Sequence, residues 1–316
     1  MKLSEFKLNA ADFRTMGRGL QRPECVWVDE DGIWASDVRG GVAHVRENAE
    51  PKLHGSGIVV PNGFSRRRDG SFVVAGIGEG RFHLIASDGK TRVLLDSFDG
   101  KPLGTVNYAC VDGPDRIWLS MMTCKPHWGN ALTSRDVDGY ILRLDAEGVH
   151  GEIVADGLDS TNEVKVSPDG RYLYAAETLG CRVVRFPIRS DGSLGERETV
   201  GPKSLGRGAF PDGITFDLWG NLWITIISQN GLMVIDRHGD THFIYRDKNE
   251  SVVESMAASV ELRNSTIEHL MACASEAGPL SLPTSLAFGG KDGRTAYVGS
   301  LTLSHLPTFR LPERLE

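Results

Sequence analysis

The chain has 316 residues, enough for one large domain or two ordinary ones, and its 40% hydrophobic and 24% charged residues are typical of a soluble globular protein. The formal net charge of −7 argues against a nucleic-acid-binding protein, which would carry a basic face. No run approaches the roughly 20 apolar residues of a membrane helix, so no membrane partner is expected. The first residues, MKLSEFKLNAADF, lack the apolar core of a secretory signal, and the five cysteines form no CxxC pair. We therefore expect a cytoplasmic protein with reduced thiols.

One pattern recurs along the chain: a short apolar strand, a turn rich in Asp, Gly or Asn, and a second apolar strand. In chain order the copies read ECVWVDEDGIWAS, NGFSRRRDGSFVVA, NYACVDGPDRIWLS, NEVKVSPDGRYLYAA, DGITFDLWGNLWIT and TSLAFGGKDGRTAYVG, starting at residues 24, 62, 107, 162, 212 and 284. A further hairpin follows most copies, so each repeat supplies about four short strands. Six repeats of roughly 40–50 residues predict an all-β fold, a six-bladed β-propeller in which residues 1–316 form a single domain.

Two segments lie outside the repeat. Residues 6–8 are expected to supply the strand that closes the ring with the last blade, since closure removes exposed sheet edges. The segment Ser251–Gly278 is rich in Ala, Met, Leu and Glu, with apolar residues at helical spacing, and it predicts one or two helices inserted before blade six. Three roles stay open for this insertion: a packed flap, a contact in a homo-oligomer, and a lid over the substrate.

Alignment of the six copies places oxygen-bearing side chains at one equivalent position. In five copies this residue lies five positions before a residue that anchors the turn, and the sixth is aligned by matching AFGG to TFDL. The six residues are Glu24, Asn62, Asn107, Asn162, Asp212 and Thr284. Because the innermost strand of every blade begins or ends at the central tunnel of a propeller, we expect these side chains to converge at one end of that tunnel.

The chemistry of this set indicates a metal site. Two carboxylates, three amides and one hydroxyl, with no His or Cys, suit a hard cation and favour Ca²⁺, with Mn²⁺, Mg²⁺ and Zn²⁺ as alternatives. Taken singly, Asn and Asp before Gly are ordinary turn formers whose side chains bind the local backbone. Turn formation does not explain an oxygen at all six equivalent positions, so a metal site is the better interpretation.

Four segments resemble, in the right order, motifs of the senescence marker protein, gluconolactonase and luciferin-regenerating enzyme family of regucalcin-like propellers. They are RPECVWVDEDGIWASDVRGGV, TNEVKVSPDGRYLYAAETLGCRVVRFPI, FPDGITFDLWGNLWIT and LPTSLAFGGKDGRTAYVGSL, within roughly residues 20–301. The resemblance implies a six-bladed propeller with a divalent cation, usually Ca²⁺, held by Glu24, Asn162 and Asp212. Asn107 matches a further tunnel residue that contacts metal or substrate. The resemblance also implies hydrolysis, mostly of lactones, with Asp212 as general base and the cation polarising the carbonyl.

The chain departs from the animal sugar lactonases of this family beside the tunnel. Those enzymes carry an Arg two residues before the tunnel Asn, where this chain has Thr105, and an Asp after it, where this chain has Tyr108. A lactone or ester less polar than an aldonolactone is therefore expected. Candidate substrate contacts come from the tunnel set and from the segment Ser120–Asp136, which leaves a strand of blade three. They are Asn62, Asn107, Thr284, Met121, Thr123, His127 and Trp128, with Glu177 and Thr178 as further candidates in blade four.

Three functions stay open at this point. The first is a metal-dependent lactonase or esterase. The second is a metal-dependent phosphotriesterase or another hydrolase on the same scaffold, and the resemblance implies that Asp212 is the nucleophile in a phosphotriesterase. The third is a non-enzymatic propeller that binds calcium or a partner, because a fold does not fix a function. Two carboxylates in the tunnel favour the first two, since a scaffold has no need of them there.

Overall fold

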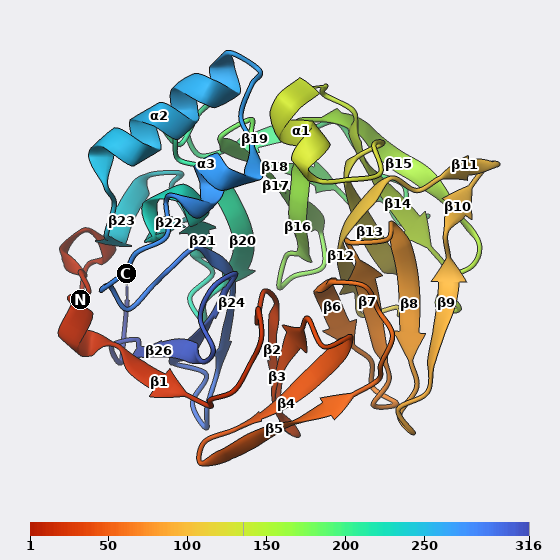
Figure 1. The fold of residues 1–316 in the computed structure, drawn as a ribbon, viewed down its shortest axis with the longest axis horizontal. Helices are drawn as coiled ribbons and strands as arrows, with labels where there is room; N and C mark the ends of the chain where they lie inside the picture. The colour runs from red at the N-terminus through yellow and green to blue at the C-terminus, as the bar shows by residue number, and fades with distance from the viewer. Residues whose placement is uncertain (135, 316) are drawn as a thin grey trace.

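The computed structural model describes residues 1–134 and 136–315; residue 135, inside the Ser120–Asp136 segment, and residue 316 lie outside the described residues. Six four-stranded antiparallel sheets are arranged as blades around a central axis (Figure 1). The strands that lie innermost in the ring are β2, β6, β12, β16, β20 and β24. The prediction of a six-bladed propeller is confirmed.

The first five blades follow the chain from the axis outward. Blade one contains β2 (Val26–Asp29), β3 (Gly32–Asp37), β4 (Gly41–Arg46) and β5 (Ala49–His54). Blade two contains β6 (Pro61–Arg66), β7 (Phe72–Gly76), β8 (Arg81–Ile85) and β9 (Thr91–Leu95), and is followed by the small hairpin β10 (Ser97–Phe98) and β11 (Lys101–Pro102). Blade three contains β12 (Thr105–Val111), β13 (Ile117–Thr123), β14 (Gly139–Leu144) and β15 (Gly151–Leu158). Blade four contains β16 (Thr161–Val166), β17 (Tyr172–Glu177), β18 (Arg182–Pro187) and β19 (Glu198–Val200), and blade five β20 (Pro211–Phe216), β21 (Leu222–Ile226), β22 (Gly231–Ile235) and β23 (Thr241–Arg246).

Blade six joins the two ends of the chain. Its strands are β24 (Pro283–Gly289), β25 (Thr295–Ser300), β26 (Leu306–Arg310) and, at the outer edge, β1 (Arg14–Met16). An N-terminal strand completes blade six, as expected, but it lies at Arg14–Met16 and not around residues 6–8. Phe6 and Leu8 are buried among residues of blades five and six, and the Leu8 N–H donates to the carbonyl of Ile244 (2.9 Å). Single-turn 3₁₀ helices at Leu3–Glu5 and Ala10–Asp12 flank them, and regular strand pairing begins only afterwards, at Arg14.

A carboxylate fixes the turn between the first two strands in three of the blades. In each, an Asp oxygen accepts a hydrogen bond from the indole N–H of a tryptophan on the second strand. The pairs are Asp29–Trp34 (3.3 Å), Asp112–Trp118 (3.0 Å) and Asp217–Trp223 (3.0 Å). Each of these Asp residues lies five positions after a residue of the tunnel set, so the same contact holds the inner strand at one height in three blades.

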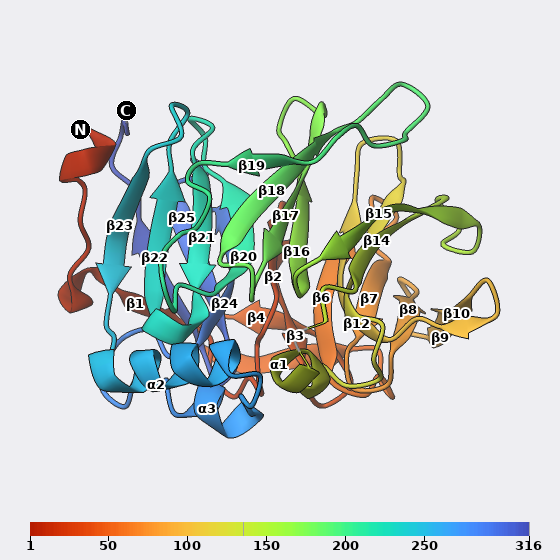
Figure 2. The same cartoon turned by 90° about the horizontal axis from the view of Figure 1, so that it is seen from above.

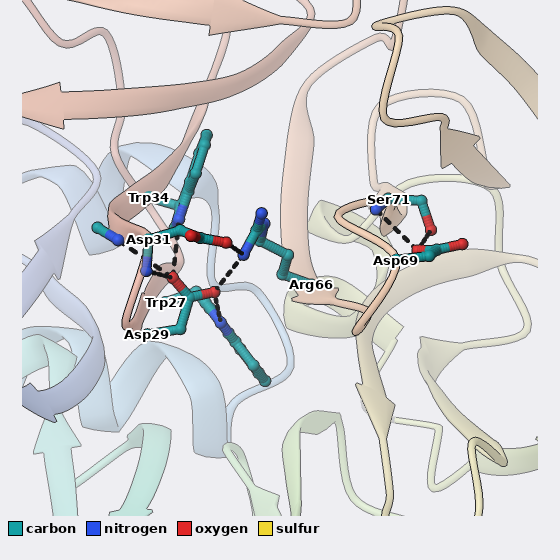
Figure 3. Close-up of polar contacts among 8 residues, drawn as sticks. Trp27, Asp29, Asp31, Trp34, Arg66, Asp69 and Ser71 are labelled. Atoms are coloured by element: carbon teal, nitrogen blue, oxygen red, sulfur yellow. Dashed lines mark hydrogen bonds and ion pairs between the residues drawn. The ribbon is translucent and has the colours of Figure 1, made fainter.

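Figure 3 shows this turn in blade one beside its counterpart in blade two. Asp29 also accepts a hydrogen bond from the indole of Trp27 (3.1 Å) and pairs with Arg66 of β6 (2.9 Å), which ties the first blade to the second. In blade two, Asp69 accepts from both the backbone N–H (2.9 Å) and the hydroxyl (2.6 Å) of Ser71. Different side chains therefore close equivalent turns, which explains why the second copy of the repeat aligns loosely.

The apolar core lies between neighbouring blades. For example, Ala176 and Val183 of blade four share a buried cluster with Ile224 and Met233 of blade five. Among the described residues, no two of the five cysteines are joined in a disulfide.

Three α helices gather on one face of the propeller: α1 (Gly129–Ser134), α2 (Glu250–Glu261) and α3 (Ile267–Met271) (Figure 2). The last two form the insertion before blade six, as predicted. The N-terminus of α2 is capped by Asn249, and Val253, Met256 and Val260 recur at helical spacing on its buried side. A single-turn 3₁₀ helix at Ile227–Gln229 connects β21 to β22. Within residues 1–134 and 136–315, no helix is long and apolar enough to span a bilayer.

Candidate metal centre and active site

The end of the tunnel on the helical face contains a cavity of about 60 Å³. All six residues of the tunnel set contribute to its lining: Glu24, Asn62, Asn107, Asn162, Asp212 and Thr284. The structure thus brings together side chains that are as far as 260 positions apart in the chain. Their convergence follows from the fold, because each stands at the start of, or just before, the innermost strand of its blade.

Irregular strand pairing aims most of these side chains inward. The regular register between the first two strands is interrupted between Pro61 and Phe64, Val106 and Tyr108, Thr161 and Val164, Pro211 and Ile214, and Pro283 and Leu286. Each interruption contains the tunnel residue of that blade. A bulge of this kind re-aims a side chain at the price of a few ladder bonds, and here it turns the polar group toward the axis.

Four of the six residues carry a buried oxygen without a hydrogen-bond partner. These atoms are Glu24 Oε2, Asn107 Oδ1, Asn162 Oδ1 and Asp212 Oδ1. Burying a polar atom without a partner costs about 1–3 kcal/mol, so four such atoms in one cavity need a reason. A hard cation that prefers carboxylate and amide oxygens fits this set. No group of three or more His, Cys, Asp or Glu side chains among the described residues forms a metal cluster, so a cation here would depend on the amides.

The other two members of the set are occupied by contacts within the protein. Asn62 accepts a hydrogen bond from Arg22 (3.0 Å) and donates to the backbone carbonyl of Asn107 (3.0 Å). The hydroxyl of Thr284 donates to the backbone carbonyl of Glu24 (2.6 Å). These two residues therefore brace the neighbouring strands and leave fewer atoms free for a ligand.

The two carboxylates of the cavity strongly resist ionisation. Burial raises the pKa of Glu24 to about 8, and the nearby charge of Glu163 adds to this effect, whereas the Arg22 guanidinium opposes it. Burial also raises the pKa of Asp212 well above its usual range, and Glu24 and Glu163 contribute in the same direction. A bound cation would reverse this tendency, because it favours the charged forms.

Thr178 holds the amide of Asn162 in place. The Asn162 side-chain N–H donates to the Thr178 hydroxyl (3.1 Å), which in turn donates to the carbonyl of Pro211 (2.7 Å). This chain directs the unpartnered Oδ1 of Asn162 away from Thr178, and Thr178 itself lines the cavity. Glu177, the other candidate of blade four, pairs instead with Arg182 (2.6 Å) and does not line the cavity.

Arg22 is a cavity residue that sequence reasoning missed. Its guanidinium lies in the cavity wall and binds Asn62 and the carbonyl of Pro61 (3.3 Å). Its charge lowers the pKa of both Glu24 and Asp212. The side chain reaches this place because residue 22 has a φ of 53°, in the left-handed region that an arginine seldom adopts. The only sequence signal was its position two residues before Glu24.

Next to the tunnel set, further along the inner strands, the interior of the propeller is filled by side chains. Tyr108 packs so closely on Gly63 that a Cβ at residue 63 would lie 2.2 Å from the tyrosine Cδ2. Lys165 donates to the Tyr108 hydroxyl (2.9 Å). Glu163 accepts from the backbone N–H of Ile214 (3.0 Å), and burial raises its pKa to about 7.

The candidates from the Ser120–Asp136 segment divide into two groups. Trp128 lines the cavity. Met121 lies instead in the core between blades two and three, the Thr123 hydroxyl accepts from the backbone N–H of Lys125 (3.3 Å), and His127 is exposed. Met122 takes the place expected of Met121, because adjacent side chains on a strand point to opposite faces.

Three helices contribute to the wall of the cavity on the helical face of the propeller. Ala131 and Leu132 of α1, Met256 of α2 and Leu270 of α3 all contribute to its lining. The inserted helices therefore lie over the candidate site rather than on a distant surface.

Comparison with known proteins agrees with this architecture. Residues 22–256 match the family described as SMP-30/Gluconolactonase/LRE-like region. A 6-deoxy-6-sulfogluconolactonase from Pseudomonas putida is 25% identical over 283 residues, which cover 88% of this chain and 82% of that protein. A gluconolactonase structure from Xanthomonas campestris matches with a TM-score of 0.70 at 20% identity, over 95% of this chain and 89% of that one. A structure of regucalcin, a calcium-binding protein from Agrobacterium tumefaciens, matches with a TM-score of 0.66 at 15% identity, over 96% of each chain. The chain belongs to the SMP-30/gluconolactonase/LRE-like family.

Proposed function

We propose that this protein is a lactonase that requires a divalent cation, preferably Ca²⁺, in the tunnel cavity. Membership of a gluconolactonase-like family supports a hydrolase. The observation that carries the proposal is the convergence of four buried oxygens without partners on Glu24, Asn107, Asn162 and Asp212. Two carboxylates and two amides match the oxygen ligands of Ca²⁺ in charge and in kind.

The roles of the four residues follow from their chemistry. They would hold the cation together, and when bound it would supply polarisation of the lactone carbonyl. Asn107 and Asn162 hold no exchangeable proton of suitable acidity, so they serve as neutral ligands. Glu24 lies beside Arg22, whose charge favours the ionised carboxylate.

Asp212 is the group we assign to proton transfer. Its carboxylate takes a proton from the attacking water as the new C–O bond to the carbonyl carbon forms. The ring C–O bond then breaks, and the proton passes from Asp212 to the alkoxide oxygen that leaves. The product is the open hydroxy acid, and Asp212 regains its charge.

The test is Asp212→Asn, compared with Asp88→Asn at an exposed turn as a matched control. The cavity variant should fold and largely retain Ca²⁺ binding, because an amide oxygen replaces a carboxylate oxygen, yet lose turnover. Full activity in Asp212→Asn would remove this residue from the chemistry.

The reaction class can be identified by assaying a panel of lactones, esters and phosphotriesters. Each should be assayed after EDTA treatment and again after addition of Ca²⁺, Mn²⁺, Mg²⁺ or Zn²⁺. Lactone turnover that disappears with EDTA and returns with a cation supports the proposal. Preference for phosphotriesters, turnover that ignores EDTA, or no turnover of any substrate contradicts it.

A further inference from the structure

The candidate cavity has two chemically different halves. Its floor consists of the tunnel set and Arg22, which supply the charged and amide groups. Its roof consists of apolar side chains from the segment before α1 and from the three helices. We call these residues the apolar cap: Trp128, Ala131, Leu132, Met256 and Leu270. Eleven of the twenty residues that line the cavity are apolar, and no member of the apolar cap offers a hydrogen bond to a small neutral ligand except through the Trp128 indole.

The apolar cap is held firmly over the floor. Asn230 donates from its side chain to the carbonyls of Asp247 (3.0 Å) and Cys273 (2.8 Å), which precede and follow the two inserted helices, and accepts from the N–H of Leu282 (2.8 Å). Arg207 pairs with two glutamates of α2 at 3.0 and 3.1 Å. These contacts tie both ends of the insertion to residues in and next to blade five, which places Met256 and Leu270 over the floor.

Such a roof discriminates between substrates by their substituents. A hydroxyl that is buried against it without a partner lowers affinity by about tenfold or more. Each methylene that moves from water into it raises affinity by about fourfold. Methionine at the contact, as at Met256, adapts to substituents of different shape because its side chain is unbranched. The small cavity favours short substituents over long ones.

We propose that the substrate is a small lactone with a neutral apolar substituent. This inference rests on the proposed lactonase function. The ring carbonyl faces the floor, close to Asp212 and Asn107, and the alkyl or aryl substituent lies under α2 and α3. A polyhydroxylated sugar lactone is disfavoured, because its hydroxyls would face the apolar cap.

The direct test measures binding without turnover. δ-Lactams with a hydrogen, methyl, propyl or pentyl substituent, and glucono-δ-lactam, are titrated calorimetrically into the calcium-loaded wild-type protein. The expected result is a dissociation constant that falls about fourfold per methylene over the short substituents, with glucono-δ-lactam the weakest ligand. A flat alkyl series, or tighter binding of glucono-δ-lactam than of the propyl compound, overturns the inference.

Matched variants identify the surface that is responsible. Met256→Gln places an amide in the roof. The ratio between the dissociation constants of the hydrogen and propyl compounds should therefore become smaller by about fivefold or more. Met271→Gln makes the same change on α3, at a side chain that is 40% exposed and lies outside the cavity lining, and should leave the series unchanged. Equal effects of the two substitutions contradict the assignment, and the wild-type series stands as a test even if Met256→Gln fails to fold.

Turnover assays with the corresponding lactones distinguish a failure of the apolar-substrate inference from a failure of the proposed lactonase function. Preferential binding of alkyl lactams combined with no turnover of any lactone overturns the lactonase assignment alone. Turnover with a preference for glucono-δ-lactone overturns the apolar-substrate assignment alone.

Discussion

Replacement of Glu24 by Gln tests how strongly the cavity demands a cation. Burial raises the pKa of this carboxyl from 4.5 to about 8. Each tenfold change in proton affinity is worth about 1.4 kcal/mol, so ionisation of Glu24 in the metal-free folded protein costs on the order of 5 kcal/mol. The unfolded chain loses its proton above about pH 4.5, whereas the folded protein keeps it up to about pH 8. The stability of the metal-free protein therefore falls as the pH rises, by about 2 kcal/mol between about pH 6 and 8, because Glu24 is already partly ionised near pH 8.

Thermal unfolding after EDTA treatment measures this loss. With about 2 °C of Tm per kcal/mol for a chain of this size, the wild-type Tm should fall by about 4 °C between pH 6 and 8 through Glu24. Glu24→Gln should show a smaller fall, because the amide has no proton to lose. Glu47→Gln, at an exposed turn in blade one, is the matched control and should behave like the wild type.

Calcium should reverse the trend. Its binding favours the ionised form of each carboxylate and competes with protonation, so the rise in Tm on adding Ca²⁺ should be larger at pH 8 than at pH 6. The reasoning is refuted if wild type and Glu24→Gln lose the same Tm between these pH values. It is also refuted if Ca²⁺ raises the Tm of Glu24→Gln as much as that of the wild type.

Three further predictions concern neighbouring residues. Arg22→Met removes the charge that lowers the pKa of both cavity carboxylates, so the acid limb of the pH–rate profile should move to higher pH; an unchanged limb would contradict that role. Thr178→Val removes the hydroxyl that holds Asn162, and calorimetry should show Ca²⁺ affinity weakened by about 10–100-fold, whereas an unchanged affinity would show that Asn162 needs no such support. Gly63→Ala forces a Cβ against Tyr108 and should cost about 1–3 kcal/mol in denaturant unfolding, and a neutral result would show that the tunnel can expand.

The fold was largely predictable because the propeller repeats one unit. Each copy pairs an apolar strand with a polar turn, and such units bury their faces only against one another, which led to six blades. The closing strand was not predictable by the same rule. Phe6 and Leu8 alternate like strand residues, but contacts with blades five and six bury them, and the extended pairing begins later, at Arg14. Which terminal segment completes a blade depends on packing between distant parts of the chain.

The candidate site was predictable in its floor and only in part in its surroundings, where Trp128 and Thr178 were expected and do line the cavity. The six tunnel residues share one position in the repeat, so their convergence follows from symmetry. Met122 and not Met121 lines the cavity because alternate side chains near the end of β13 point to opposite faces. An error of one residue in the expected alternation therefore selects the wrong methionine. Arg22 depends on a left-handed backbone angle, and the apolar cap depends on how an insertion folds back over the tunnel. Helical spacing predicted the inserted helices, but neither the backbone angle of Arg22 nor the position of those helices over the tunnel follows from a periodic pattern.

The central claim is that the tunnel oxygens bind a divalent cation. The most direct measurement is a crystal structure of the protein grown with Ca²⁺, with Mn²⁺ used in a second crystal for its anomalous signal. The account predicts one ion in contact with Glu24 Oε2, Asn107 Oδ1, Asn162 Oδ1 and Asp212 Oδ1, at about 2.3–2.6 Å for Ca²⁺. A cavity without an ion at saturating Ca²⁺ and Mn²⁺, or an ion bound elsewhere with these four oxygens left unliganded, would contradict it.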